Sequence, residues 1–195
     1  MVEHDRRKKE ILDKALDVFT DEGYEDTTFR KIAERCGITR TILYLYFKNK
    51  REIFSYSIKQ FTAGLEEDVL KIASGQTLSN SAKLIAILDM FLTRCALERR
   101  LLTVILGYLD HLRKSGVDPD ERVRRRTIRM RHILSTILIA GMQAGEFRRI
   151  SVRAATDLIY SLIEAAIFRI VILGKPDTGS LAESGRIMVE GLKSQ

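Results

Sequence analysis

Side chains that could recognise another molecule are concentrated in residues 28–50 of the chain. Arg40, Thr41 and Tyr44 are spaced to lie on the first turn of one short helix. An arginine can bind guanine O6 and N7, a threonine offers a hydroxyl or a methyl group, and a tyrosine can reach a phosphate or a thymine methyl group. If this helix lies in the major groove of duplex DNA, we expect these three side chains to contact base edges.

A second set of polar side chains is suited to phosphate groups: Thr28, Thr39, Tyr46, Lys48 and Lys50. Phosphate contacts supply affinity and salt dependence but carry no sequence information directly. A plainer interpretation is also open, because exposed lysines usually mark a solvated face and aromatic side chains prefer burial. By that preference we expect Phe47 in the core, and Tyr46 could lie there too.

Capping signals predict two short helices around a tight turn. Thr28 can cap the first helix, and Gly37, just past its end, can take positive φ without strain. Thr39 is the expected N-cap of the second helix, with Ile38 and Leu43 placed as the N′ and N4 pair of a hydrophobic staple. Two helices held at a set angle form a helix-turn-helix.

The charge of the chain is distributed unevenly. Its 195 residues carry a formal net charge of +7, and the pI is about 9.5. Residues 27–51 hold seven cationic side chains and one acidic side chain, a net charge of +6, whereas residues 1–26 hold five cationic and nine acidic side chains, a net charge of −4. The positive charge is therefore concentrated on the predicted helix-turn-helix, where it favours an anionic partner.

Apolar residues repeat at helical spacing along the rest of the chain, and no strand alternation is found. A first helix is expected at about residues 5–21, and the others follow at about 49–73, 84–95, 98–114, 118–144, 151–173 and 180–193. Asn49 with Glu52, and Ser180 with Glu183, are predicted capping boxes. We predict an all-α protein of about nine helices, with a three-helix DNA-binding domain in residues 1–50 and a helical ligand-binding and dimerisation domain in residues 51–195.

Apolar positions on the last two long helices could form a surface for a partner subunit. Two helices from each of two chains would make a four-helix bundle, so we expect a homodimer. The alternative is ordinary packing of these helices inside one subunit.

Several aromatic and polar side chains of the predicted core helices could line a pocket: Phe61, Phe91, Tyr108, Arg129, His132, Tyr160, Glu164 and Phe168. Such a lining would suit a small apolar or aromatic effector held in its pose by a few polar groups. Each residue could equally have a structural role, since a lone histidine on an apolar helix is more often a satisfied core residue. Most of the arginines between Arg122 and Arg131 are expected to face solvent or pair with acids.

The sequence offers little support for catalysis. It contains no glycine-rich phosphate loop, no HExxH or GxSxG motif and no cluster with metal-ligand spacing, so we expect no cofactor, no metal and no enzyme activity. Cys36 and Cys95 are expected to be buried free thiols. The charged N-terminus lacks the apolar core of a signal peptide and no apolar run reaches membrane-spanning length, so a reducing cytoplasm fits best.

Residues 28–50 closely resemble the DNA-binding domain of the tetracycline-repressor (TetR) family. The resemblance is carried by Ile32-Ala33, Gly37-Ile38-Thr39, Leu43-Tyr44, Tyr46-Phe47 and Lys50, together with Phe19 and Gly23-Tyr24 before them. The sequence from Gly141 to Arg148 is similar to a turn common in the family, whereas Thr41 stands where many members have glycine or proline. The resemblance implies a homodimeric cytoplasmic regulator, usually a repressor, that binds a near-palindromic operator and releases it when a small molecule enters the larger domain.

Two other classes of protein remain open from the residues. The chain could be a helical carrier of hydrophobic ligands whose N-terminal helices contact protein rather than DNA, or an all-helical enzyme whose site is not recognisable. Salt-dependent binding to duplex DNA would separate the regulator from both.

Overall fold

A computed structural model describes residues 2–175 and 178–194 of the chain. In this part of the chain the structure contains nine α-helices, one short π-helix and no strand. The α-helices are α1 (Val2–Asp26), α2 (Phe29–Cys36), α3 (Arg40–Tyr44), α4 (Lys50–Ser74), α5 (Asn80–Leu97), α6 (Arg99–Lys114), α7 (Pro119–Gln143), α8 (Val152–Ile167) and α9 (Gly179–Leu192), and the π-helix η1 (Phe168–Ile172) continues α8. The predicted all-α fold is confirmed.

The helix boundaries follow local sequence signals closely. The helical conformation of α1 is interrupted at Gly23 (φ 79°, ψ 165°), two residues after the end that the apolar pattern predicts. The Asn49 side chain accepts a hydrogen bond from the Glu52 N–H at 2.9 Å, as expected for the start of α4. The capping box at Ser180 is wrong, because α9 begins one residue earlier with Thr178 at its N-cap. The Ser180 hydroxyl instead accepts a hydrogen bond from Arg169.

The chain divides into two compact units that interleave along the sequence. The first unit comprises the residues up to Thr62 together with Arg100–Glu121, and the second comprises Ala63–Arg99 together with the residues from Arg122 on. These units differ from the two predicted domains, because half of α4 and nearly all of α6 belong with the N-terminal helices. The functional boundary at residue 50 stays a prediction.

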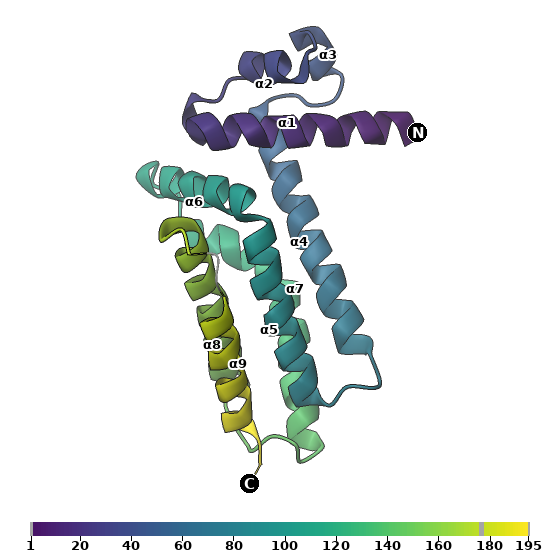
Figure 1. The fold of residues 1–195 in the computed structure, drawn as a ribbon, viewed down its shortest axis with the longest axis vertical. Coiled ribbons are helices and arrows are strands. Elements are labelled where there is room, and N and C mark those ends of the chain that lie inside the picture. The colour runs from purple at the N-terminus through teal and green to yellow at the C-terminus, as the bar shows by residue number, and fades with distance from the viewer. Residues whose placement is uncertain (1, 176–177, 195) are drawn as a thin grey trace. The chain divides into compact units, whose positions relative to one another are not determined.

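The core of the first unit joins five helices. In Figure 1, α1 lies along one side of the pair formed by α2 and α3. The buried cluster takes Ile11, Leu12, Ala15, Val18 and Phe19 from α1, Ile32 and Ala33 from α2, Leu43 from α3, Phe47, Ile53, Phe54 from the start of α4 and its preceding loop, and Leu101 and Val104 from α6. The helix-turn-helix is therefore braced by α4 and α6 as well as by α1.

The second unit has an apolar core in which α5 contacts α8 and α9. Ile87, Leu88 and Phe91 of α5 are buried, as are Ile159 of α8 and Val189 of α9. None of the helices that the structure describes combines the length and apolarity needed to cross a membrane.

Candidate nucleic-acid interface

The turn between α2 and α3 is fixed by backbone hydrogen bonds and two threonine caps. The Lys31 N–H donates to the Thr28 hydroxyl oxygen, and the Ile42 N–H donates to the Thr39 hydroxyl oxygen, each at 3.2 Å. Gly37 adopts φ 65°, and the Ile38 N–H closes the Schellman motif on the Ala33 carbonyl at 3.0 Å. The capping signals predicted for this turn are thus confirmed.

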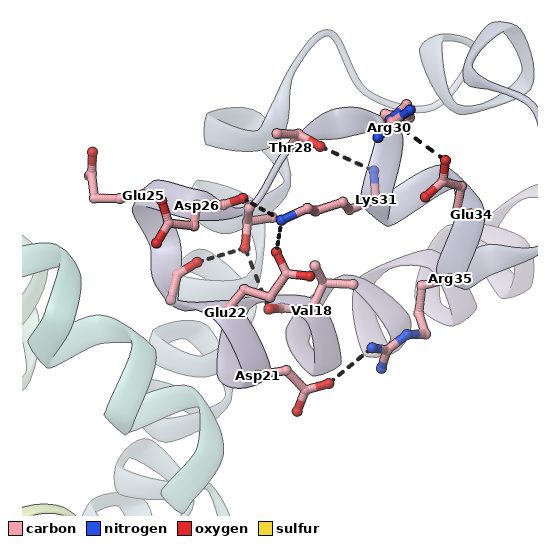
Figure 2. A network of polar contacts seen from close by, with 12 residues as sticks. Val18, Asp21, Glu22, Glu25, Asp26, Thr28, Arg30, Lys31, Glu34 and Arg35 are labelled. Carbon is pink, nitrogen blue, oxygen red and sulfur yellow. Dashed lines mark hydrogen bonds and ion pairs between the residues drawn. The ribbon is translucent and has the colours of Figure 1, made fainter.

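Ion pairs hold α2 against α1. Figure 2 shows the Lys31 ammonium group between the Glu22 carboxylate and the Asp26 carbonyl oxygen. Arg35 pairs with Asp21 at 3.0 Å. Arg30 pairs with Glu34 on its own helix at 3.6 Å (Figure 2). The acidic residues of α1 therefore neutralise much of the positive charge that α2 carries.

This pairing changes where the free positive charge of the helix-turn-helix lies. Four of the seven cationic residues of the stretch 27–51 form no ion pair within the described part of the chain: Lys50, whose ammonium group hydrogen-bonds to backbone carbonyls, and Arg40, Lys48 and Arg51. Among the described residues, the last three have no such contact to occupy their charge. Arg40 begins α3, and the other two flank the start of α4. The unneutralised charge thus lies on α3, on the loop after it and on the first turn of α4.

The predicted base-contacting residues lie on the solvent side of α3. Arg40 and Thr41 are exposed, and Tyr44 is 51% exposed with its ring 4.8 Å from the ring of Phe29. Leu43, on the opposite side of the helix, is fully buried. The buried leucine anchors α3, and the three polar side chains remain available to a ligand.

The predicted phosphate contacts divide into exposed and occupied side chains. Thr28, Thr39 and Lys48 are exposed, and both threonine hydroxyl groups still have a hydrogen to donate beyond the caps they accept. Tyr46 is half-buried and stacks on His4 with ring centroids 4.8 Å apart, while Phe47 is buried as expected.

Lys50 is used inside the protein. Its ammonium group donates hydrogen bonds to the Tyr24 carbonyl at 2.8 Å and the Glu25 carbonyl at 2.7 Å, and it lies 4.8 Å from the centre of the Tyr24 ring. Burial lowers the pKa of the Lys50 amine, and the charges of Glu25 and Asp26 oppose that shift only in part. This lysine ties the start of α4 to the chain beyond Gly23, a role that the sequence did not reveal.

Helix α6 contributes a contact that sequence reasoning missed. Tyr108 packs edge-on against Tyr24 and Phe54, with ring centroids 4.7 and 4.9 Å apart. One turn further, His111 Nδ1 lies 2.7 Å from a Glu25 carboxylate oxygen. The apolar spacing of α6 indicates a buried face, but nothing in the sequence says that this face packs on the helix-turn-helix.

The predicted ligand-pocket residues are distributed over both units. Phe61 and Tyr108 pack against the core of the first unit, and the other six belong to the second. Of those six, Phe91 and Tyr160 are buried, whereas Arg129, His132, Glu164 and Phe168 are exposed. The side chains of Arg122 and Arg126 in the arginine run lie outside the described residues. The pocket itself stays a prediction.

Tyr160 is the most strongly perturbed of these residues. Burial raises the pKa of the Tyr160 hydroxyl to about 12, and the positive charge of Arg131 opposes that shift. The Arg131 guanidinium lies over the Tyr160 ring at 3.9 Å and pairs with Asp157 at 2.7 Å. Tyr160 is therefore a neutral side chain that helps to fix α7 on α8.

An apolar groove lies on α8 and α9, where a partner surface was predicted. It has a volume of about 370 Å³ and is lined by Leu158, Leu162, Ile187, Met188, Leu192 and neighbouring residues. Ile187 is 65% exposed although it is a large apolar side chain. The groove therefore leaves apolar surface in contact with water, and the dimer interface itself stays a prediction.

Together these features define the class of helix-turn-helix DNA-binding proteins, since a short second helix presents exposed polar side chains beside unneutralised positive charge. Comparison with known proteins then narrows the class. Residues 11–56 match the family model of bacterial regulatory proteins of the tetR family. A fatty acid metabolism regulator protein of Bacillus subtilis is 29% identical over 163 residues, which cover 81% of this chain and 80% of the relative. Residues 11–56 therefore form a DNA-binding domain of the tetR type, and over most of its length the chain is similar to transcriptional regulators that carry this domain.

Solved structures agree with this fold. A tetR-family regulatory protein from Rhodococcus RHA1 superposes with a TM-score of 0.76 at 19% identity, covering 97% of this chain and 98% of that one. The ketosteroid transcriptional regulator KstR2 of Mycobacterium tuberculosis gives a TM-score of 0.73 at 21% identity, covering 97% and 96%. At these identities the structures establish the shared fold, and the similarity to the tetR family rests on the sequence matches.

Proposed function

We propose that the protein is a repressor that binds a near-palindromic operator as a homodimer and is released by a small, largely apolar effector. The observation that carries the DNA-binding part is the exposed face of α3, where Arg40, Thr41 and Tyr44 stand beside the unpaired charges of Lys48 and Arg51. Arg40 reads a guanine, and Thr41 and Tyr44 contact the neighbouring bases. A regulator of this kind works in the cytoplasm.

The phosphate contacts come from side chains that remain free at the edges of α3. Thr28 and Thr39 donate their hydroxyl hydrogens, and Lys48 places an ammonium group beside the DNA backbone. Tyr46 offers its hydroxyl from a half-buried ring. Lys50 contributes by holding α4 in place, because its ammonium group is already bound by two carbonyl groups.

The groove on α8 and α9 supports the dimer. Burying its leucines and isoleucine against the same groove of a second chain gives a four-helix bundle with two-fold symmetry, which a near-palindromic operator requires. The test is Ile187→Glu, measured by analytical ultracentrifugation. We expect this variant to be monomeric and to bind a half-site only weakly, whereas Leu97→Glu, a control at a leucine that is 73% exposed, stays dimeric. A dimeric Ile187→Glu protein would contradict the proposed interface.

The Bacillus subtilis relative, by its name a regulator of fatty acid metabolism, favours a fatty acid or a derivative as the effector. An apolar ligand suits the second unit, whose buried residues are mostly aliphatic. Helix α4 has residues in both units. A ligand that binds only one arrangement of the second half of α4 can therefore change the spacing between the two helix-turn-helix copies of the dimer. Such coupling is typically about 1–3 kcal/mol.

The effector is tested with octanoate and palmitate, using a ketosteroid as the competing class. The proposal expects a fatty acid to raise the melting temperature and to weaken operator binding by about 5- to 150-fold. A fatty acid that raises the melting temperature and leaves operator affinity unchanged would refute induction. A response to the ketosteroid alone would refute the effector class.

A further inference from the structure

Leu45 is the most exposed large apolar side chain among the described residues of the first unit. It is 75% exposed, and it lies at the C-cap of α3 in helical conformation (φ −68°, ψ −23°). A leucine so placed exposes apolar surface on the very helix whose other exposed residues are suited to base contacts. Leu45 is not among the hydrophobic residues that form the core of the first unit or pack against it.

The position of Leu45 on the helix places it with the base-contacting residues. At 100° per residue, Leu45 follows Thr41 by four residues and is rotated from it by only about 40°, whereas buried Leu43 is about 160° away from Thr41. Ile42 and Tyr44, on either side of the same face, are also exposed, at 40% and 51%. The outward face of α3 therefore ends in a leucine one turn beyond Thr41.

We propose that Leu45 is a specificity-determining residue that contacts the C5-methyl group of a thymine in the operator. A hydrocarbon side chain in the major groove has one apolar feature to contact, and only thymine presents it. One helical turn rises about 5.4 Å and base pairs are about 3.4 Å apart, so this thymine lies one or two base pairs from the base facing Thr41. This inference rests on the proposed function, because it takes α3 to lie in the major groove.

The test replaces thymine by uracil, which removes the C5-methyl group and keeps the pairing. An operator is first selected with the full chain from a random duplex pool, and each thymine of one half-site is then replaced in turn. We expect one position at which uracil weakens binding of the unmodified protein about fourfold, the effect of losing about one buried methyl contact. Leu45→Ala should bind the thymine operator about fourfold more weakly per half-site and show no further loss at that uracil.

Leu97→Ala is the matched control, because Leu97 is 73% exposed and belongs to the second unit. This variant should keep both the affinity and the uracil effect of the unmodified protein. Both variants should melt at the temperature of the unmodified protein, since neither side chain is packed. A flat uracil scan on a selected operator, or Leu45→Ala that keeps the uracil effect, would overturn this inference and leave the proposed function standing. A pool that yields no operator at all would overturn both.

Discussion

Replacing Lys50 by methionine separates the two roles open to this lysine. Methionine keeps the length of the side chain and removes the ammonium group that binds the Tyr24 and Glu25 carbonyls. If Lys50 acts inside the protein, the change lowers stability and leaves the number of DNA phosphate contacts as it was. If Lys50 binds DNA, the change leaves stability as it was and lowers the number of DNA phosphate contacts.

The size of the effect follows from the contacts. Hydrogen bonds to a charged group contribute about 1.5–3 kcal/mol each, but burial of the amine, which lowers the pKa of Lys50, offsets part of that gain. We therefore expect a net loss of about 2 kcal/mol for the two bonds together. For a chain of this length that corresponds to a fall of roughly 4–8 °C in melting temperature.

Lys48→Met is the matched variant, because Lys48 is exposed and its side chain has no partner among the described residues. Thermal melting and the salt dependence of operator binding are measured for both variants. Lys48→Met should melt like the unmodified protein and reduce the slope of log K against log salt by about 2 for a dimer with one phosphate contact per subunit. Lys50→Met with an unchanged melting temperature and a reduced slope would refute the structural role.

Two further predictions concern the second unit. The Glu146 carboxylate accepts hydrogen bonds from two backbone N–H groups at the start of α5. Burial raises the pKa of this carboxyl group, but the hydrogen bonds outweigh burial and lower the pKa to about 2. A carboxylate whose pKa is depressed in the folded state stabilises the fold above its unfolded pKa near 4.5. Glu146→Gln should therefore cost about 1–2 kcal/mol of stability at pH 7, a figure discounted for solvent screening. In melting experiments, the stability difference between the two proteins should shrink as the pH falls from 4.5 towards 2. A stability difference that does not change with pH would contradict this role of the Glu146 carboxylate. Gly141→Ala should cost about 1–3 kcal/mol of stability in urea denaturation, because the added Cβ would lie 2.1 Å from Phe147 Cδ2. The control is Gly107→Ala, where an added Cβ meets nothing within 4 Å, and it should be neutral or slightly stabilising. Equal effects of the two substitutions would refute the packing argument.

The features that sequence could predict are those fixed by near neighbours. Thr28, Gly37 and Thr39 act on backbone groups within five residues, so their capping roles follow from their spacing. The longer helices of the described residues follow from the apolar repeats in the same way. The prediction for Ser180 failed because α9 begins at Gly179, after an N-cap residue, Thr178, whose side chain makes no capping bond and so gives no sequence signal.

The features that sequence could not predict depend on partners far along the chain. Lys31 pairs with Glu22, and Lys50 reaches the carbonyl of Tyr24, 26 residues before it. The charge sum over residues 27–51 treated these lysines as free, although the fold had already neutralised or bound them. Tyr108 was assigned to a ligand pocket on its aromatic character, and only the fold shows that it packs on the helix-turn-helix core.

The most direct test of the account is operator selection from a random duplex pool with three proteins. The unmodified chain should select a near-palindromic motif with a guanine at one position of each half-site. Arg40→Ala should lose the preference at that guanine, whereas Arg153→Ala, which removes the same charge from an arginine whose side chain is 94% exposed in the second unit, should select the unmodified motif. If Arg40→Ala selects the same motif as the unmodified chain, the exposed face of α3 does not read the operator and the account is wrong.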